Sequence, residues 1–380
     1  MIYFDNSATT RPSPKVAEVL SRELLSDELY GNPGSIHKLG TKASRSYDAA
    51  LKKAAELLHC GADELYFTSC GTENTNTVIE GYLSRNRRAG KTVITTGTEH
   101  KATLETVKRA ETLYGSKTVY IKTLPDGTPD LEELENSIDD DTAMLCFTHV
   151  NNESGAILPL EKIVAIRDRK NRNTKIFLDC VQSLGKLPID LSGMKIDMAS
   201  FSGHKIHSVK GTGLMYIRKG INIDPLIVGG GQQKGMRSGT QSLFLADAFV
   251  TALEEAVNDR KEAYERVEKI NLFLREELVK RKAVINSPAD ALPFVLNVAF
   301  DGFESETMLH ALESFDICVS TVSACSSKTK AVSYVLLEMG IPRKTAANSV
   351  RLSFSKFNTM EEAEKFIETV DKIYELYALK

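Results

Sequence analysis

Apolar runs alternate with helix-type patterns along the middle of the chain, from about Glu64 to Ile217. The runs have the length of buried strands, and the stretches between them repeat apolar residues at intervals of three and four positions. Strands are expected at 64–68, 91–96, 117–121, 143–148 and 175–178, and helices at 75–83, 104–113 and 160–169. This alternation predicts an α/β fold with a doubly wound, mostly parallel central sheet and helices on both faces.

The pattern changes on both sides of this region. Ser13 before Pro14 indicates a helix start, because Ser caps helices and Pro fits the first helical position. Residues 243–281 form a long helical pattern rich in Glu, Lys and Arg. Beyond it, strand-like runs at 295–300 and 350–354 are interspersed with helical patterns at 306–315 and 360–377. We therefore expect a large domain over 13–250 and a smaller α+β domain over 251–380.

Composition sets broad limits on function. The chain has 380 residues, of which 42% are apolar, and a formal charge of −3, so it can bury a large core and has no overall attraction for nucleic acid or anionic membranes. The longest apolar stretch, 291–300, is too short for a membrane span, and no signal-peptide pattern opens the sequence. Six scattered cysteines without a CxxC pair favour reduced thiols and no metal site. We expect a soluble, cytoplasmic protein.

Lys205 and Asp179 are the first candidates for chemistry. Lys205 ends the segment Ser-Phe-Ser-Gly-His-Lys at 200–205, and Asp179 follows the apolar run 175–178. A lysine amine that loses its proton can form a Schiff base, and an ionised Asp at the carboxyl edge of the sheet can keep a pyridine nitrogen protonated. Either residue alone would more often be a surface or turn residue. Together they are typical of a pyridoxal phosphate site.

A glycine turn supports this interpretation. Gly71 and Thr72 follow the expected strand 64–68 and open a helical pattern, where backbone N–H groups and a hydroxyl can bind a phosphate. The hydroxyl of Ser202 and the imidazole of His204 fit the same role beside Lys205. Alone, a Gly-Thr pair before a helix is usually only a cap.

Further motifs follow in a fixed order along nearly the whole chain. They are Tyr-Phe-Asp-Asn-Ser-Ala-Thr-Thr at 3–10, Gly-Asn-Pro-Gly-Ser at 31–35, Thr-Glu-His-Lys-Ala at 98–102, His-Val-Asn-Asn-Glu at 149–153, Gly-Lys-Leu-Pro-Ile-Asp at 185–190, Gly-Gly-Gly at 229–231, Gly-Met-Arg-Ser-Gly-Thr at 235–240, Ser-Ala-Cys-Ser-Ser at 323–327, Ser-Tyr-Val-Leu at 333–336 and Val-Arg-Leu-Ser at 350–353. In this order the motifs resemble the class V aminotransferase superfamily, and within it the NifS/IscS-type cysteine desulfurases.

The resemblance implies a fold type I enzyme that binds pyridoxal 5'-phosphate, works as a homodimer and converts L-cysteine to L-alanine. It places residues 1–12 with the smaller domain. By the same resemblance, His100 stacks on the cofactor and moves a proton. The residues that hold the cofactor are expected to be Gly71, Thr72, Asn152, Asp179, Gln182, Ser202, His204, Lys205 and, from the neighbouring subunit, Thr240. The residues expected to face the substrate are Asn32, His37, Asn152 and Arg351. A guanidinium suits the substrate carboxylate because its planar donors bind both oxygens.

Cys325 distinguishes sulfur transfer from transamination. Its segment, 321–332, is small and polar, with two lysines close behind, which favours a loop carrying a reactive thiol. In the mechanism that the resemblance implies, cysteine replaces Lys205 on the cofactor, His100 or Lys205 moves the α proton, and the thiolate attacks the substrate sulfur. The products are alanine and a Cys325 persulfide. The sulfur would pass to an acceptor protein, such as an iron–sulfur scaffold or a tRNA-thiolation protein.

The chain departs from the family pattern at several positions. Val322 stands where relatives carry Gly, and Val332 stands where they carry Pro. Gln232 and Gln233 occupy the positions of a His-Glu pair, and Ser208 and Val209 occupy those of a Gly-Pro pair. Such changes are compatible with an altered substrate preference or acceptor. The alternatives left open are a selenocysteine lyase, another class V enzyme such as an aminotransferase, and a catalytically reduced sulfur-trafficking or scaffold-binding protein.

Overall fold

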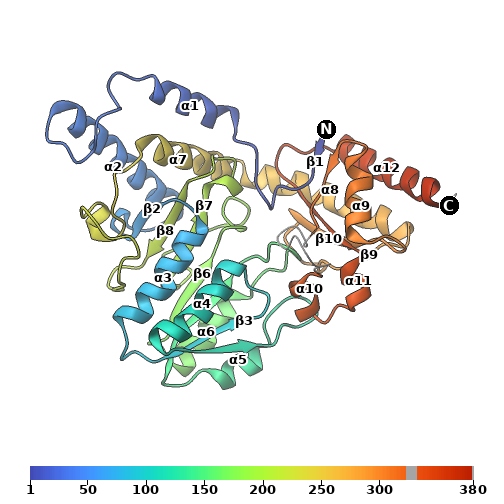
Figure 1. Ribbon diagram of the computed structural model, residues 1–380, viewed down its shortest axis with the longest axis horizontal. Coiled ribbons are helices and arrows are strands. Elements are labelled where there is room, and N and C mark those ends of the chain that lie inside the picture. The colour runs from blue at the N-terminus through green and yellow to red at the C-terminus, as the bar shows by residue number, and fades with distance from the viewer. Residues whose placement is uncertain (322–331, 379–380) are drawn as a thin grey trace.

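A central seven-stranded sheet organises the larger part of the computed structural model, which describes residues 1–321 and 332–378 (Figure 1). The strands are β2 (Leu65–Thr68), β3 (Thr92–Thr96), β4 (Lys117–Ile121), β5 (Thr142–Thr148), β6 (Lys175–Asp179), β7 (Met198–Ser202) and β8 (Gly213–Ile217). Their spatial order is β2-β8-β7-β6-β5-β3-β4. β3 to β7 pair in parallel, and β8 is antiparallel to both of its neighbours. The predicted mostly parallel α/β sheet is confirmed.

Helices cover both faces of this sheet. They are α1 (Pro14–Leu24), α2 (Lys38–Leu58), α3 (Gly71–Arg85), α4 (Lys101–Tyr114), α5 (Leu131–Ser137), α6 (Leu160–Lys170) and α7 (Leu243–Asn258). Successive side chains of a strand point to opposite faces. In β5, Leu145 and Phe147 join a core with α2, α6 and α7, whereas Met144 and Cys146 join a second core with α3 and α4. The central strands are therefore buried on both faces, which explains their unbroken apolar runs.

Local signals account for most element boundaries. The Ser13 hydroxyl accepts a hydrogen bond from the N–H of Val16, so α1 starts where the Ser-Pro pair indicated. The predicted strand at 64–68 begins one residue later, because a 3-10 turn (Ala62–Glu64) precedes it. The long helical pattern at 243–281 is two helices, α7 and α8 (Arg260–Lys280), which meet at Asp259. Between β6 and β7, residues 180–197 form turns and no helix.

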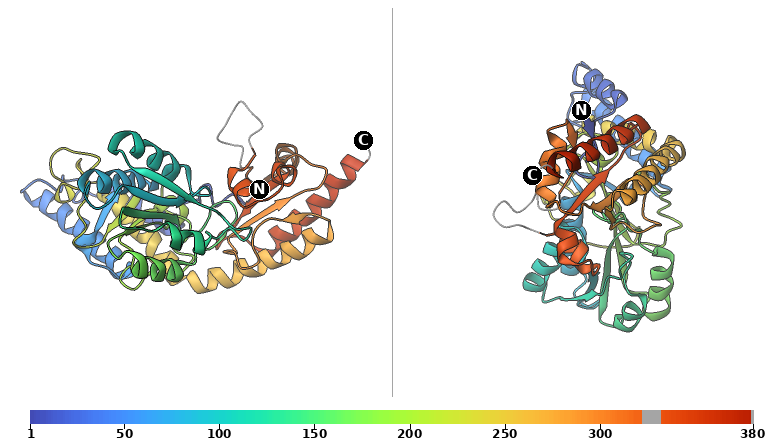
Figure 2. Two further views of the ribbon diagram at one scale, coloured as in Figure 1. Left: turned by 90° about the horizontal axis from the view of Figure 1, so that it is seen from below. Right: turned by 90° about the vertical axis from the view of Figure 1, so that its right-hand side faces the viewer.

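The smaller part is built around a three-stranded antiparallel sheet. Its strands are β9 (Val284–Ile285), β10 (Val295–Ala299) and β12 (Ser349–Ser353), in the order β12-β10-β9. The associated helices are α8, α9 (Ser305–Glu313), α10 (Tyr334–Glu338), α11 (Arg343–Ala347) and α12 (Met360–Ala378). Figure 2 shows α8 and α12 lying side by side along its outer edge.

The amino-terminal residues lie in this smaller part. β1 (Ile2–Tyr3) pairs in parallel with β11 (Ile317–Cys318), and Phe4 is fully buried in the apolar core of the smaller sheet. Asp5 forms a bridge with Ser353 of β12. The chain thus crosses from the smaller part to the larger one after its first residues. The boundaries 1–12, 13–250 and 251–380 stay predictions. Within the described ranges, no helix combines the length and apolarity that a bilayer span requires.

Candidate active site

A cavity of about 480 Å³ lies at the carboxyl edge of the parallel strands, where the larger and smaller parts meet. Asp179 at the end of β6 and Ser202 at the end of β7 form its floor, and Arg351 of β12 reaches it from the smaller part. The predicted site residues that line this cavity are Gly71, Thr72, His100, Asn152, Asp179, Gln182, Ser202, His204, Lys205 and Arg351. The topology therefore assembles predicted site residues that lie up to 280 positions apart in the sequence, from Gly71 to Arg351.

Three predicted residues lie away from this cavity. Thr240 is exposed and lines a separate cavity of about 90 Å³. Asn32 and His37 are also exposed; the Asn32 Oδ1 accepts the N–H of Gly34 at 2.9 Å, and His37 caps α2. Cys325, the proposed sulfur nucleophile, lies outside the described residues.

Lys205 occupies a short turn (Gly203–Lys205) directly after β7. Its Nζ donates to the carbonyl oxygens of Ser7 at 2.6 Å and Ala8 at 2.7 Å. Burial lowers the pKa of this amine to about 8, and the positive charge of Arg351 adds to the effect. Because desolvation disfavours the ammonium form, Lys205 can supply an uncharged nucleophilic amine closer to neutral pH than an exposed lysine can.

Asp179 and His100 both line the cavity, and their charges influence each other. Burial raises the pKa of Asp179, while the neighbouring His100 and Lys205 partly oppose that rise. Its Oδ1 accepts the N–H of Val181 at 2.9 Å. The Nδ1 of His100 accepts the N–H of Ala102 at 3.1 Å, so the neutral ring carries its proton on Nε2. Partial desolvation within the cavity and the charge of Lys205 lower the pKa of His100, which favours this neutral form.

The start of α3 has the properties of an anion site. Its N-cap, Cys70, makes no side-chain hydrogen bond to the helix, so the N–H groups of the first turn stay available. Ser202 contributes a buried hydroxyl without a hydrogen-bond partner in the described part of the chain. A Cβ on Gly71 would lie 2.9 Å from Cγ2 of Val181, so a larger residue would not fit the turn. These groups suit a phosphate.

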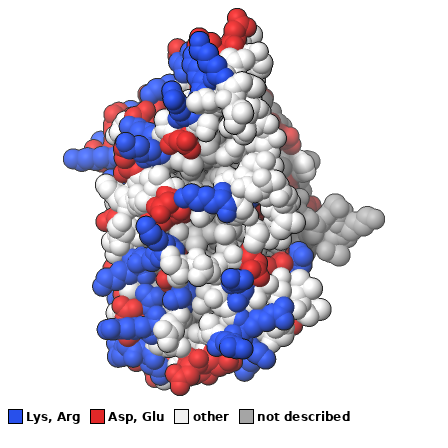
Figure 3. Space-filling model, turned by 90° about the vertical axis from the view of Figure 1, so that its left-hand side faces the viewer, with Lys and Arg blue, Asp and Glu red and all other residues white. Residues whose placement is uncertain are grey.

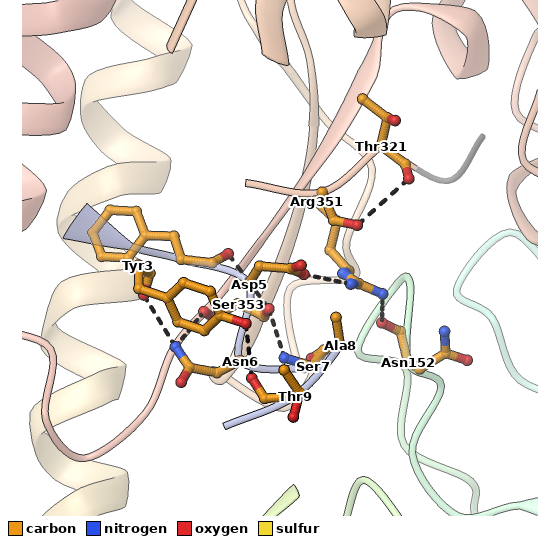
Figure 4. A network of polar contacts seen from close by, with 12 residues as sticks. Tyr3, Asp5, Asn6, Ser7, Ala8, Thr9, Asn152, Thr321, Arg351 and Ser353 are labelled. Atoms are coloured by element: carbon orange, nitrogen blue, oxygen red, sulfur yellow. Dashed lines mark hydrogen bonds and ion pairs between the residues drawn. The ribbon is translucent and has the colours of Figure 1, made fainter. Parts of the chain in front are cut away.

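Arg351 is held from two sides (Figure 4). Its Nη2 lies 2.7 Å from Oδ1 of Asp5, and its Nη1 donates to the carbonyl oxygen of Asn152 at 3.1 Å. Its buried Nε has no hydrogen-bond partner among the described residues. The guanidinium therefore presents a fixed positive charge at the wall of the cavity, in a position suited to a carboxylate.

The amino-terminal segment was missed as a source of site residues. The carbonyl of Ser7 accepts from both Lys205 and Gln182, and Asp5 pairs with Arg351. Figure 4 shows how the segment is tied down: the Asn6 amide donates to the Ser353 carbonyl at 3.0 Å. The motif at 3–10 predicts no role for its main chain. The run of small polar residues after an apolar pair was the signal that could have found it.

The departures from the family pattern have local structural partners. The Gln233 amide bonds with both the N–H and the carbonyl of Phe67, at 2.8 and 2.7 Å, along the edge strand β2. Gln232 accepts the N–H of Gly239 at 2.9 Å. Ser208 is buried, and Val332 packs against the small apolar cluster of α10 and α11. Val322 lies outside the described residues.

Comparisons with known proteins agree with this geometry. Residues 2–366 match the family profile described as Aminotransferase class-V. The chain is 39% identical to a NifS/IcsS protein homolog of Lactobacillus delbrueckii subsp. bulgaricus, over 100% of this chain and 98% of that protein. It is 38% identical to the cysteine desulfurase IscS of Escherichia coli, over 98% of this chain and 92% of that protein.

Solved structures show the same similarity. A NifS-like protein superposes with a TM-score of 0.93 at 38% identity, covering 99% of each chain. A NifS-like protein from Rickettsia africae superposes with a TM-score of 0.85 at 27% identity, again over 99% of each chain. The resemblance read from the motifs and the expected fold type I architecture are both confirmed.

Proposed function

This chain belongs to the class V aminotransferase family and to its group of NifS/IscS homologues, and from this we propose that it is a pyridoxal-phosphate-dependent cysteine desulfurase. It converts L-cysteine to L-alanine and keeps the removed sulfur as a persulfide on Cys325. The observation that carries the proposal is that the Lys205 amine, the Asp179 carboxyl and the uncapped start of α3 face one cavity.

The cavity residues fit pyridoxal 5'-phosphate. The first turn of α3, the free hydroxyl of Ser202 and the neighbouring His204 suit the phosphate, and Asp179 suits the pyridine nitrogen. A protonated pyridine would stabilise the buried Asp179 carboxylate, whose ionisation burial otherwise opposes. His100 provides a ring for stacking, and the Gln182 amide provides a donor for the ring oxygen. Lys205 is the amine that would attach to the carbonyl carbon.

Different residues of the chain would carry out different steps of the reaction. When bound, pyridoxal phosphate withdraws electrons from the substrate carbons. Arg351 binds the substrate carboxylate, and Lys205 or His100 moves the α proton. The Cys325 thiolate attacks the substrate sulfur: a sulfur–sulfur bond forms, the carbon–sulfur bond breaks, and its electron pair remains with the carbon skeleton. Protonation of that skeleton then yields alanine, so no external oxidant or reductant is required.

The protein is proposed to act as a homodimer, because three assigned residues lie away from the cavity of their own chain. Thr240, Asn32 and His37 are all exposed. Large apolar side chains are exposed in the same segments: Leu25 is 84% exposed, Ile36 100% and Val228 77%. Figure 3 shows the side of the molecule that carries α1 and α2, where uncharged surface runs down the middle and Lys and Arg gather along one edge. A second copy covering this side would bury the apolar residues and bring Thr240 to its neighbour's phosphate site.

The product sulfur is proposed to pass to an acceptor protein, such as an iron–sulfur scaffold or a tRNA-thiolation protein. The cytoplasm is the proposed compartment. Five cysteines are free among the described residues, which suits a reducing environment. The identity of the acceptor does not enter the chemistry at Lys205.

Incubation with L-cysteine tests the proposal, with alanine and protein-bound persulfide measured in the same samples. Equal amounts of both in the first turnover, without added reductant, are expected. Alanine without persulfide would point instead to a lyase, and a strong preference for selenocysteine would identify a selenocysteine lyase. Amino-group transfer to a keto acid would identify an aminotransferase. A cofactor-loaded protein that forms neither product would support the scaffold-binding alternative.

A further inference from the structure

The orientation of the Gln182 amide is set by two neighbours. Its Nε2 donates to the carbonyl oxygen of Ser7 at 3.0 Å, and its Oε1 accepts from Nζ of Lys186 at 3.2 Å. A carbonyl oxygen can only accept, so the Ser7 contact requires the amide nitrogen on that side. The amide oxygen then faces Lys186. Gln182 is 4% exposed and lines the cavity, where its second N–H remains available.

Lys186 is a buried amine whose hydrogen bond to Gln182 is the one observed for it in the described part of the chain. It is 9% exposed, and burial, with the nearby charge of Lys205, lowers its pKa to about 7. Both the charged and the neutral amine carry N–H donors, so the bond to Gln182 does not require the charge. Burying an amine is unfavourable unless its contacts compensate, and the proposed chemistry leaves this one without a role.

The fold holds the two side chains together through the turn after β6. The N–H groups of Lys186 and Leu187 both donate to the Ser183 carbonyl, at 3.0 and 2.9 Å. This tight turn places the side chains of Gln182 and Lys186 on one side, where they form their hydrogen bond. Gly185 completes the turn with φ of 73°, and a Cβ there would lie 2.6 Å from the Cβ of Ala256.

We propose that Lys186 is a positioning residue: it holds the Gln182 amide so that an N–H, and not the amide oxygen, faces the ring oxygen of the bound cofactor. This inference rests on the proposed function. Without Lys186, only the hydrogen bond to Ser7 opposes inversion of the amide, because the final side-chain torsion of Gln by itself has a broad, nearly two-fold preference. Inverted amides would then place an acceptor against the anionic ring oxygen and weaken cofactor binding.

A double-mutant cycle tests the proposal on the full-length protein, with Lys186→Met, Gln182→Leu and the pair. The readouts are the dissociation constant of pyridoxal phosphate and the pH midpoint of its absorption change when bound. Methionine keeps the length and apolar contacts of lysine but cannot donate. Alone, Lys186→Met should weaken binding about fivefold and shift the absorption midpoint; in the Gln182→Leu protein it should change binding by less than about twofold.

Lys356→Met is the matched control. Lys186 and Lys356 both line a cavity of about 40 Å³ behind Lys205, but Lys356 pairs with Asp259 at 2.6 Å and does not contact Gln182. It should leave both readouts unchanged. Lys186→Arg retains a donor and should bind the cofactor within about twofold of the parent protein, which gives a second result if Lys186→Met does not fold.

Each outcome decides a separate question. Equal effects of Lys186→Met with and without Gln182, or an effect of Lys356→Met as large as that of Lys186→Met, would overturn the positioning role and leave the proposed function intact. Binding by Lys186→Arg as weak as that of Gln182→Leu would also overturn it. A parent protein that does not bind pyridoxal phosphate would refute the proposed function and this inference with it.

Discussion

The Asp5 carboxylate holds the guanidinium of Arg351 at 2.7 Å, although the two residues lie near opposite ends of the chain. Arg351 is 7% exposed and also donates to the carbonyl oxygen of Asn152. A buried cation is unfavourable without an opposite charge nearby, and the Asp5 carboxylate supplies that charge to Arg351 when no substrate is bound. The pair orients Arg351 toward the cavity and joins the amino terminus to β12.

Replacing Arg351 with Lys should affect substrate binding more than turnover. Lysine keeps the charge but lacks the planar pair of donors, so KM for L-cysteine should rise about tenfold and kcat should change less. Steady-state alanine formation measures both constants. Arg266→Lys, at an exposed residue of α8 paired with Glu262, is the control and should behave as the parent. An unchanged KM would contradict the assignment of Arg351 to the substrate carboxylate.

Lys205 should react with the cofactor at a lower pH than an ordinary lysine. Only the unprotonated amine is nucleophilic, and burial lowers its pKa to about 8. The rate of covalent cofactor uptake by the apoprotein should therefore rise with pH and level off above about 8, and not near 10.4. Stopped-flow absorbance measures this rate. Borohydride reduction and peptide mapping should then place the label on Lys205 and find none in Lys205→Ala; a label on another lysine would refute the assignment.

Asp179→Asn should separate cofactor binding from catalysis. The substitution removes the charge that keeps the pyridine nitrogen protonated but leaves the phosphate donors of α3 in place. Cofactor content should stay near that of the parent, while alanine formation should fall by about two orders of magnitude. Absorbance and alanine assays on the same sample measure both. Near-normal turnover would show that Asp179 does not have this role.

Hybrid dimers should reveal whether Thr240 acts across subunits. Lys205→Ala and Thr240→Ala are each expected to be impaired, and a mixed dimer should have one site that lacks both groups and one intact site. Random mixing should restore roughly a quarter of the parent activity. Differently tagged subunits allow the mixed dimers to be purified and counted. Purified hybrids no more active than the two variants would rule out a shared site.

Cys325→Ser should stop sulfur transfer without disturbing the cofactor. Serine is similar in size but is a far poorer sulfur nucleophile at neutral pH. The variant should bind pyridoxal phosphate and change its absorption spectrum with L-cysteine, while persulfide and catalytic alanine release fall together. Cys60→Ser, at a half-buried residue beside α2, is the control. Full desulfuration by Cys325→Ser would favour a selenocysteine lyase or another class V activity.

Most of the secondary structure could be predicted from the sequence, because the signals involved are local. The run 143–148 became β5, whose alternate side chains fill two cores, and the Ser-Pro pair at 13–14 started α1. The place of Asp179 at the carboxyl edge also followed from sequence, since it directly follows an apolar strand. The motifs indicated the family, which the comparisons confirmed.

The set of groups that meet around Lys205 depends on tertiary packing and could not be predicted from local patterns. The Ser7 carbonyl oxygen accepts hydrogen bonds from Lys205 and Gln182, and the Asp5 carboxylate pairs with Arg351. These contacts join residues that lie about 175 to 350 positions apart in the sequence. A run of small polar residues marks the segment, but the direction of its main-chain carbonyls depends on how β1 and β12 pack. The same holds for Lys186, whose burial depends on the turn after β6. Hydrogen-bond partners across a fold are set by packing, which the local pattern of residues does not encode.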